Sequence, residues 1–208
     1  RGANDRLAAA CAANPKRFAA FGALPTVDAV GLNQQTDYLS ESTDIWVPVL
    51  GSFDKKLPLI ASHLQKGGQA WYYTCIEPRG RHLNRFIDYP LVKVRLLHWF
   101  NYRHDFSGFL HWGGNYWSPE PFENVEPVIN DGATLLPPGD NAIVYPDPER
   151  NSVLSSVRLE VMREGIEDYE LFKLLEKQDP KKAATLARTA IPNITDYLRD
   201  VPEFRKHL

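Results

Sequence analysis

The sequence of 208 residues has little of what several common kinds of functional site require. Its two cysteines, Cys11 and Cys75, stand far apart and in no metal-like or redox-like spacing, which argues against a disulfide framework and a zinc site. The six histidines show no HExxH or comparable spacing, and the P-loop, GxGxxG and GxSxG motifs are absent. The sequence therefore predicts no metal and no cofactor.

Charge and hydrophobicity argue against two classes of partner. The formal net charge is -2 and comes from interspersed acidic and basic residues, without the one-sided basic face that attracts a phosphate backbone. No apolar run approaches the roughly 20 residues of a membrane span, and no signal peptide is recognisable. We therefore expect neither nucleic acid nor membrane as a partner. The compartment is left open.

Strand-like and helix-like segments alternate through the middle of the chain. The β-branched and apolar runs typical of buried strands cover residues 26–30, 44–50, 69–76 and 107–112. Helical spacing separates the later runs, over 53–66 and 91–104. Such alternation indicates parallel β/α units with helices covering the sheet, so the expected fold class is α/β.

The remainder of the chain divides into a loop and a helical tail. The segment 113–151 holds seven of the sixteen prolines and is far longer than an ordinary connection, which is typical of functional loops. Beyond it, helices are expected over 155–177, 180–190 and 193–208. The charged string 155–170 has the spacing of ion pairs along a helix surface, and we interpret it as structural.

Candidate binding residues follow from the rule that ligand-contacting groups gather at the carboxyl ends of parallel strands. A pyranose ring has an apolar face and a rim of hydroxyls, and both aromatic and amide side chains occur in the segment GFLHWGGNYW at 108–117. The candidates for binding a sugar are Tyr73, Glu77, Asp88, His111, Trp112, Asn115 and Trp117.

Each candidate also has a structural interpretation. Trp112 and Trp117 can cap the core beneath the loop, Asp88 can be the N-cap of the helix that follows Pro90, and Glu77 can be a solvated loop residue. Tyr73 and its neighbour in the strand point to opposite faces, so only one of them can face a ligand.

Five segments together resemble the catalytic domain of glycoside hydrolase family 123 and its uncharacterised relatives. They are TDIWVP at 43–48, WYYTC at 71–75, NRFIDYPLVKVRLLHWFNYR at 84–103, GFLHWGGNYW at 108–117 and SSVRLEVMREGIEDYELFKLL at 155–175. The resemblance implies a (β/α)8 TIM-type barrel. This chain would contain about its last four strands, over 28–151, with trailing helices packed on the barrel over 152–208.

The same resemblance implies a chemistry. Characterised members are β-N-acetylgalactosaminidases that retain configuration and use the substrate's acetamido group as nucleophile, assisted by an adjacent Asp-Glu pair. No Asp is followed by Glu in this sequence, so no catalytic residue is assigned here. We expect either the sugar-binding half of a hydrolase whose upstream half carries the pair, or a non-catalytic carbohydrate-binding or scaffold protein.

The resemblance also bears on partners and location. An amino-sugar glycoside is the expected ligand, and an extracellular or periplasmic location fits the family. Four strands cannot close a barrel, so we expect association with an upstream half or self-association. We expect residues 1–27 to form a separate helical segment. It is similar to a stretch of metal-dependent amidohydrolases, although the HxH motif of those enzymes is absent.

Overall fold

The chain divides into two compact units, Arg1–Asp44 and Ile45–Leu208. The computed structural model describes residues 9, 12–13, 45–127, 132–133 and 135–200. In the first unit the three described alanines are helical, and the strand expected at 26–30 lies outside the described residues.

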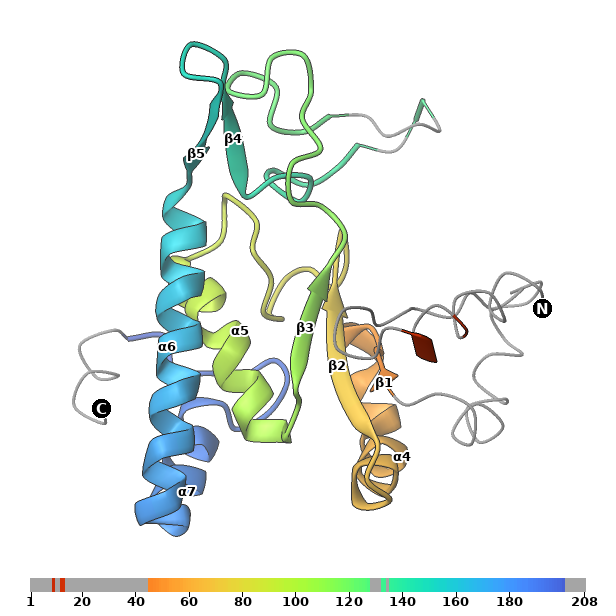
Figure 1. The fold of residues 1–208 in the computed structure, drawn as a ribbon, viewed down its shortest axis with the longest axis vertical. Helices are drawn as coiled ribbons and strands as arrows, with labels where there is room; N and C mark the ends of the chain where they lie inside the picture. Colours follow the sequence, from red (N-terminus) through yellow and green to blue (C-terminus); the bar gives the residue numbers. More distant parts are fainter. Residues whose placement is uncertain (1–8, 10–11, 14–44, 128–131, 134, 201–208) are drawn as a thin grey trace. The chain divides into compact units, whose positions relative to one another are not determined.

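A three-stranded parallel sheet forms the centre of the second unit (Figure 1). Its strands lie side by side in chain order and are β1 (Ile45–Trp46), β2 (Gln69–Thr74) and β3 (Gly108–His111). The connections contain the short 3-10 helix η1 (Leu50–Ser52) and the helices α4 (Phe53–Gln65) and α5 (Leu91–His104). Parallel strands joined through helices confirm the α/β class, and three of the four expected strands are among the described residues.

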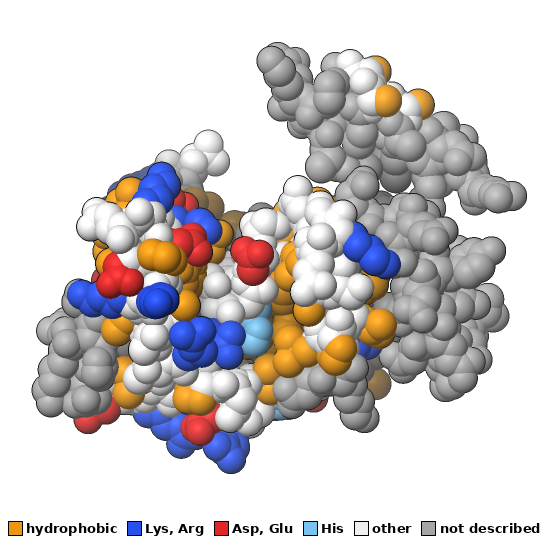
Figure 2. Space-filling model, turned by 90° about the horizontal axis from the view of Figure 1, so that it is seen from below, with side chains coloured by type: hydrophobic (Ala, Val, Ile, Leu, Met, Phe, Trp, Pro, Cys, Tyr) orange, Lys and Arg blue, Asp and Glu red, His pale blue; other side chains and the backbone are white. Residues whose placement is uncertain are grey.

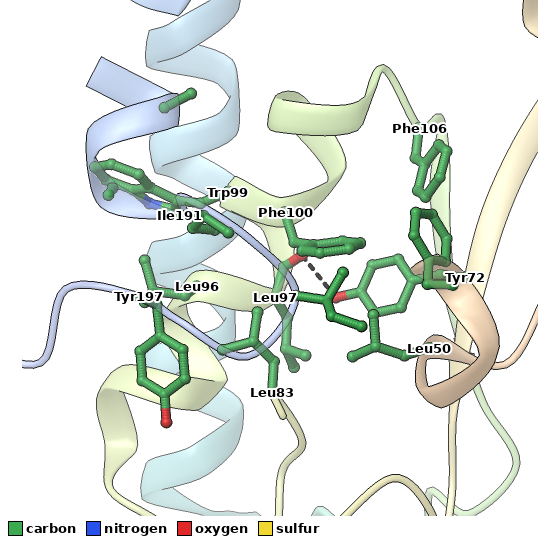
Figure 3. Close-up of a cluster of buried hydrophobic side chains, with 14 of the residues drawn as sticks. Leu50, Tyr72, Leu83, Leu96, Leu97, Trp99, Phe100, Phe106, Ile191 and Tyr197 are labelled. Atoms are coloured by element: carbon green, nitrogen blue, oxygen red, sulfur yellow. Dashed lines mark hydrogen bonds between the residues drawn. The ribbon is translucent and has the colours of Figure 1, made fainter. Parts of the chain in front are cut away.

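The core extends from the sheet across α5 to the C-terminal helices, and it mixes aromatic with aliphatic side chains (Figure 3). Tyr72 and Phe109 are register partners on the helix-facing side of β2 and β3, with ring centroids 5.0 Å apart. Tyr72 is completely buried, and its hydroxyl donates to the backbone oxygen of Leu97 at 2.7 Å. Burying each such ring stabilises the fold by about 1.5–3 kcal/mol, so this layer fixes the sheet on its helix.

Two C-terminal helices pack against α5. They are α6 (Val157–Gln178) and α7 (Pro180–Ala190). Helix α6 begins at the N-cap Ser156, whose hydroxyl accepts from the Leu159 N–H at 3.2 Å. Asp168 on α6 accepts from both Arg95 at 2.7 Å and the Trp99 indole at 2.8 Å on α5. The helices therefore pack through a carboxylate with several donors as well as through apolar contacts.

Two expectations about the tail and the long loop were wrong. Residues 193–200 are not helical: the Thr195 N–H donates to the Asn193 side chain at 3.0 Å, which forms a turn directly after Pro192. Residues 201–208 lie outside the described part. The long loop ends in an antiparallel hairpin of β4 (Val144–Asp147) and β5 (Ser152–Ser155). The sequence did not predict these strands, because β4 contains a proline and all residues of β5 are exposed.

Three partly buried histidines make stability depend on pH. Burial lowers the pKa of His98, His104 and His111 to about 4, from an ordinary value of 6.5. Between these values the unfolded chain binds more protons than the folded chain, so stability present above about pH 6.5 is lost as the pH falls towards 4. We expect the urea midpoint of unfolding to fall steadily from about pH 7 to about pH 4.5.

His82, a partly exposed residue of the loop after β2, supplies the control for this titration. A His82→Gln variant should show the same fall in midpoint as the wild type. A midpoint that stays constant between about pH 7 and about pH 5 would show that the buried imidazoles are not held neutral.

Within the described residues, no helix combines the length and the apolar character that crossing a membrane requires.

Candidate functional site

The carboxyl end of β3 delivers two aromatic side chains to a buried carboxylate. The indole nitrogen of Trp112 donates to one oxygen of Asp140 at 2.7 Å, and Nε2 of His111 lies 3.2 Å from the other oxygen. Asp140 has no exposed surface at all, although it belongs to the long loop. A buried carboxylate needs polar partners, and here the indole donor and the neighbouring imidazole both come from the end of the strand.

Gly113 allows this loop to come so close to β3. A β-carbon built at Gly113 would lie 2.7 Å from the backbone oxygen of Asp140 and 2.9 Å from the α-carbon of Asn141. Any larger residue would push the loop away from the strand. The glycine therefore serves close packing of backbone on backbone.

Arg85 fixes the protonation of His111. Its Nη2 donates to Nδ1 of His111 at 2.8 Å and to the backbone oxygen of Asp140 at 3.2 Å. Because a guanidinium can only donate, Nδ1 must accept, and the proton of the neutral ring is on Nε2, facing Asp140. Burial and the neighbouring Arg158 lower the pKa of Arg85 to about 9, which still leaves it charged at neutral pH.

A second buried arginine, Arg158 at the start of α6, holds together the loops around this site. Its Nη1 donates to the backbone oxygens of Arg85 at 2.6 Å and Gly139 at 2.8 Å. Its Nη2 donates to the oxygen of Ala142 at 2.6 Å and the hydroxyl of Tyr145 at 3.2 Å. One side chain thus joins the loop after β2, the loop after β3 and β4.

Two partly exposed rings lie side by side above the carboxylate. Trp112 is 40% exposed and Tyr116 is 39% exposed, and their ring centroids are 5.5 Å apart. Asn115 is exposed and pairs with Ala142 through an isolated backbone bridge. Together these residues present aromatic surface and an amide at one edge of the parallel sheet.

The other sequence candidates are divided between this site and its surroundings. Tyr73 is half-buried on the sheet face opposite Tyr72, and burial together with Cys75 and Asp140 raises the pKa of its hydroxyl, so it belongs to the same neighbourhood. Trp117 is half-buried and donates its indole N–H to the oxygen of Val144 at 2.8 Å. Its polar edge is therefore engaged with β4.

Two acidic candidates lie on the loop after β2. Glu77 is exposed and accepts from the backbone N–H of Arg79 at 3.1 Å, which is a local turn interaction. Asp88 lines a separate cavity of about 350 Å³ with Phe86 and Tyr89. It is not the helix cap, because α5 has Pro90 at its N-cap position and no capping side chain.

A further cavity, of about 450 Å³, lies between α4, the end of α5, and the helices α6 and α7. Arg103, Lys173 and Glu176 line it together with apolar residues, and none of the sequence candidates does. Figure 2, viewed from below, shows Lys, Arg and His side chains beside hydrophobic ones.

Among the residues that the structure describes, no group of three or more His, Cys, Asp or Glu side chains could hold a metal ion.

Sequence reasoning missed the three residues that organise the site: Arg85, Asp140 and Arg158. Arg158 stands in the charged string that we interpret as surface ion pairs, yet only 3% of it is exposed. The interpretation is right for Arg163 and Glu160, which pair at 2.9 Å on the helix surface. Asp140 follows Pro-Pro-Gly in a loop, where the sequence gives no sign of burial.

Comparison with known proteins places this geometry in a family. The model of the glycoside hydrolase 123 catalytic domain matches residues 24–175. A solved structure, a family 123 glycoside hydrolase from Clostridium perfringens analysed for glycolipid glycan hydrolysis, is similar with a TM-score of 0.59 and 21% sequence identity. No curated protein matches the sequence.

The structural match extends over 74% of this chain but only 26% of the Clostridium protein. The chain thus spans about a quarter of the length of that enzyme, and at 21% identity the likeness concerns the fold alone. The family match includes all three parallel strands, the site at their carboxyl ends and most of α6. The chain therefore belongs to the glycoside hydrolase 123 catalytic-domain family.

Proposed function

We propose that the rings and polar groups at the end of β3 form the sugar-binding side of a β-N-acetylgalactosaminidase. The observation that carries the proposal is the pair of half-exposed rings, Trp112 and Tyr116, held at the carboxyl edge of a parallel sheet. A flat indole face matches the C–H face of a pyranose, and the exposed Asn115 can hydrogen-bond its hydroxyls or its acetamide.

The hydrolysis requires an adjacent Asp-Glu pair, which these 208 residues do not contain. Substrate-assisted hydrolysis needs an Asp to orient the acetamide and an adjacent Glu as general acid and then base, and the sequence has no Asp-Glu dipeptide. We propose that a segment outside these residues supplies the pair and completes a (β/α)8 barrel with the three strands. In the completed barrel, this chain binds the sugar and orients it for hydrolysis.

A non-catalytic carbohydrate-binding or scaffold protein is the second candidate, and the missing pair favours it. Both candidates predict that this chain binds an amino sugar. They differ in hydrolysis: a protein that joins this chain to an Asp-Glu segment should release nitrophenol from a nitrophenyl β-N-acetylgalactosaminide. Activity on other glycosides alone would refute the N-acetylgalactosamine assignment.

Removing the indole tests the binding site directly. We expect Trp112→Ala to weaken binding of methyl β-N-acetylgalactosaminide by about tenfold or more, because a large aromatic anchor contributes most of the contact area. Titration calorimetry of the chain measures the change.

Phe122→Ala provides the matched control for this titration. Phe122 is 61% exposed and stacks on Tyr145, with a centroid distance of 5.4 Å, so its removal also deletes an exposed ring. The control variant should keep the wild-type affinity. If the wild type shows no saturable binding of any amino sugar, the proposed function is wrong.

A further inference from the structure

Asp140 combines complete burial with contact to the exposed ring that the proposed function uses. Its carboxylate meets Trp112 on one oxygen and His111 on the other, at 2.7 Å and 3.2 Å. It touches the binding surface only through these side chains, because none of its own surface is exposed. Asp140 therefore cannot contact a bound sugar, and any effect it has on binding must act through its neighbours.

The indole of Trp112 has a single N–H, so the partner of that N–H determines how the ring lies. An indole on the surface without such a partner samples several rotamers, and binding must then order it at a cost in entropy. The bond to a fully buried carboxylate restricts this freedom before a ligand arrives. Trp112 is still 40% exposed while it makes this bond.

His111 and Arg85 keep the carboxylate in place. Nδ1 of His111 accepts from Arg85 at 2.8 Å, and the backbone N–H of Gly113 lies 3.3 Å from the same atom. With Nδ1 occupied by donors, the ring carries its proton on Nε2, which lies 3.2 Å from Oδ1 of Asp140 in a close polar contact without hydrogen-bond geometry. The pKa of His111, lowered to about 4 by burial with a further contribution from Arg85, agrees with a neutral ring.

We propose that Asp140 is a positioning residue of the sugar site, which orients the indole of Trp112 for stacking and is itself braced by His111 and Arg85. This role rests on the proposed function. It assigns to a loop carboxylate the task of preorganising the aromatic surface, so affinity should depend on a residue that the sugar does not touch.

The test uses Asp140→Asn, Trp112→Phe and the double variant in the full chain. The asparagine places an NH2 group, which only donates, where one of the two carboxylate oxygens lies, so that it faces either the Trp112 N–H or Nε2 of His111. Phenylalanine keeps an aromatic ring but has no N–H to hold it. We expect each single variant to bind methyl β-N-acetylgalactosaminide about fivefold to tenfold more weakly, and the double variant no more weakly than Trp112→Phe alone.

A spectroscopic readout separates positioning from a general loss of structure. The chain has five tryptophans, and the indole N–H resonance missing from Trp112→Phe identifies that of Trp112. In Asp140→Asn this resonance should shift upfield while those of the other four stay in place. If Asp140→Asn does not fold, Trp112→Phe still decides, because wild-type affinity in that variant would overturn the proposal.

The outcomes distinguish the two levels of the argument. Wild-type chain that binds no amino sugar would overturn the proposed function and this role with it. Wild-type binding that is unchanged in both single variants would overturn the role of Asp140 alone. Losses that simply add in the double variant would also overturn it, because they would show that Asp140 does not act through Trp112.

Discussion

Replacing Arg158 with methionine is expected to destabilise the second unit by more than about 3 kcal/mol. The guanidinium donates to the backbone oxygens of Arg85, Gly139 and Ala142, and all three lose their donor in the variant. Each buried carbonyl left unsatisfied costs about 1–3 kcal/mol, and methionine fills much of the volume without restoring a donor. Urea unfolding, followed by circular dichroism, measures the loss.

Arg163→Met is the matched control for Arg158→Met. Arg163 stands on the same helix, its side chain is 66% exposed, and its partner Glu160 is also on the surface. Such a pair contributes little, so the control should lie within about 1 kcal/mol of the wild type. Equal stabilities of the two variants would show that the buried arginine does not hold the loops.

Gly165→Ala is expected to destabilise the same unit by about 3 kcal/mol, although alanine has the higher helix propensity. Propensity alone predicts a gain of about 1 kcal/mol for this change inside α6. However, the added β-carbon would overlap the backbone oxygen of Arg95 on α5, and neither helix backbone can yield easily. The two helices would have to separate along their whole contact, which includes Asp168 and its donors.

Gly114→Ala tests whether this loss is specific to close helix packing. No heavy atom lies within 4 Å of a β-carbon built at Gly114. The free energy of unfolding of this variant should therefore lie within about 0.5 kcal/mol of the wild-type value. A stabilised Gly165→Ala variant would refute the close approach of α5 and α6.

Local sequence patterns predicted the elements well where the pattern and the packing agree. The expected helices at 91–104 and 180–190 have the observed bounds of α5 and α7, because prolines mark their starts. The expected strand at 44–50 is shorter in the structure: β1 ends at Trp46, and Val49 pairs with Tyr73 only through an isolated bridge. Periodicity locates an element, but backbone pairing sets its ends.

The site was only half predictable, for a physical reason. Trp112 and Asn115 could be found because aromatic and amide residues follow a strand end, which is a local signal. Asp140 and Arg158 act through contacts with residues 28 and 73 positions away, and no local pattern encodes such contacts. The sequence suggested that both residues are solvated, because aspartate in a loop and arginine in a charged helix usually are.

Arg158 recognises the loops almost entirely by their main chain. Three of its four acceptors are backbone oxygens, which every amino acid possesses. The side chains of these loops can therefore be exchanged during evolution without loss of the anchor, provided that the backbone keeps its path. The residues of the proposed sugar site can then change while the scaffold beneath them stays the same.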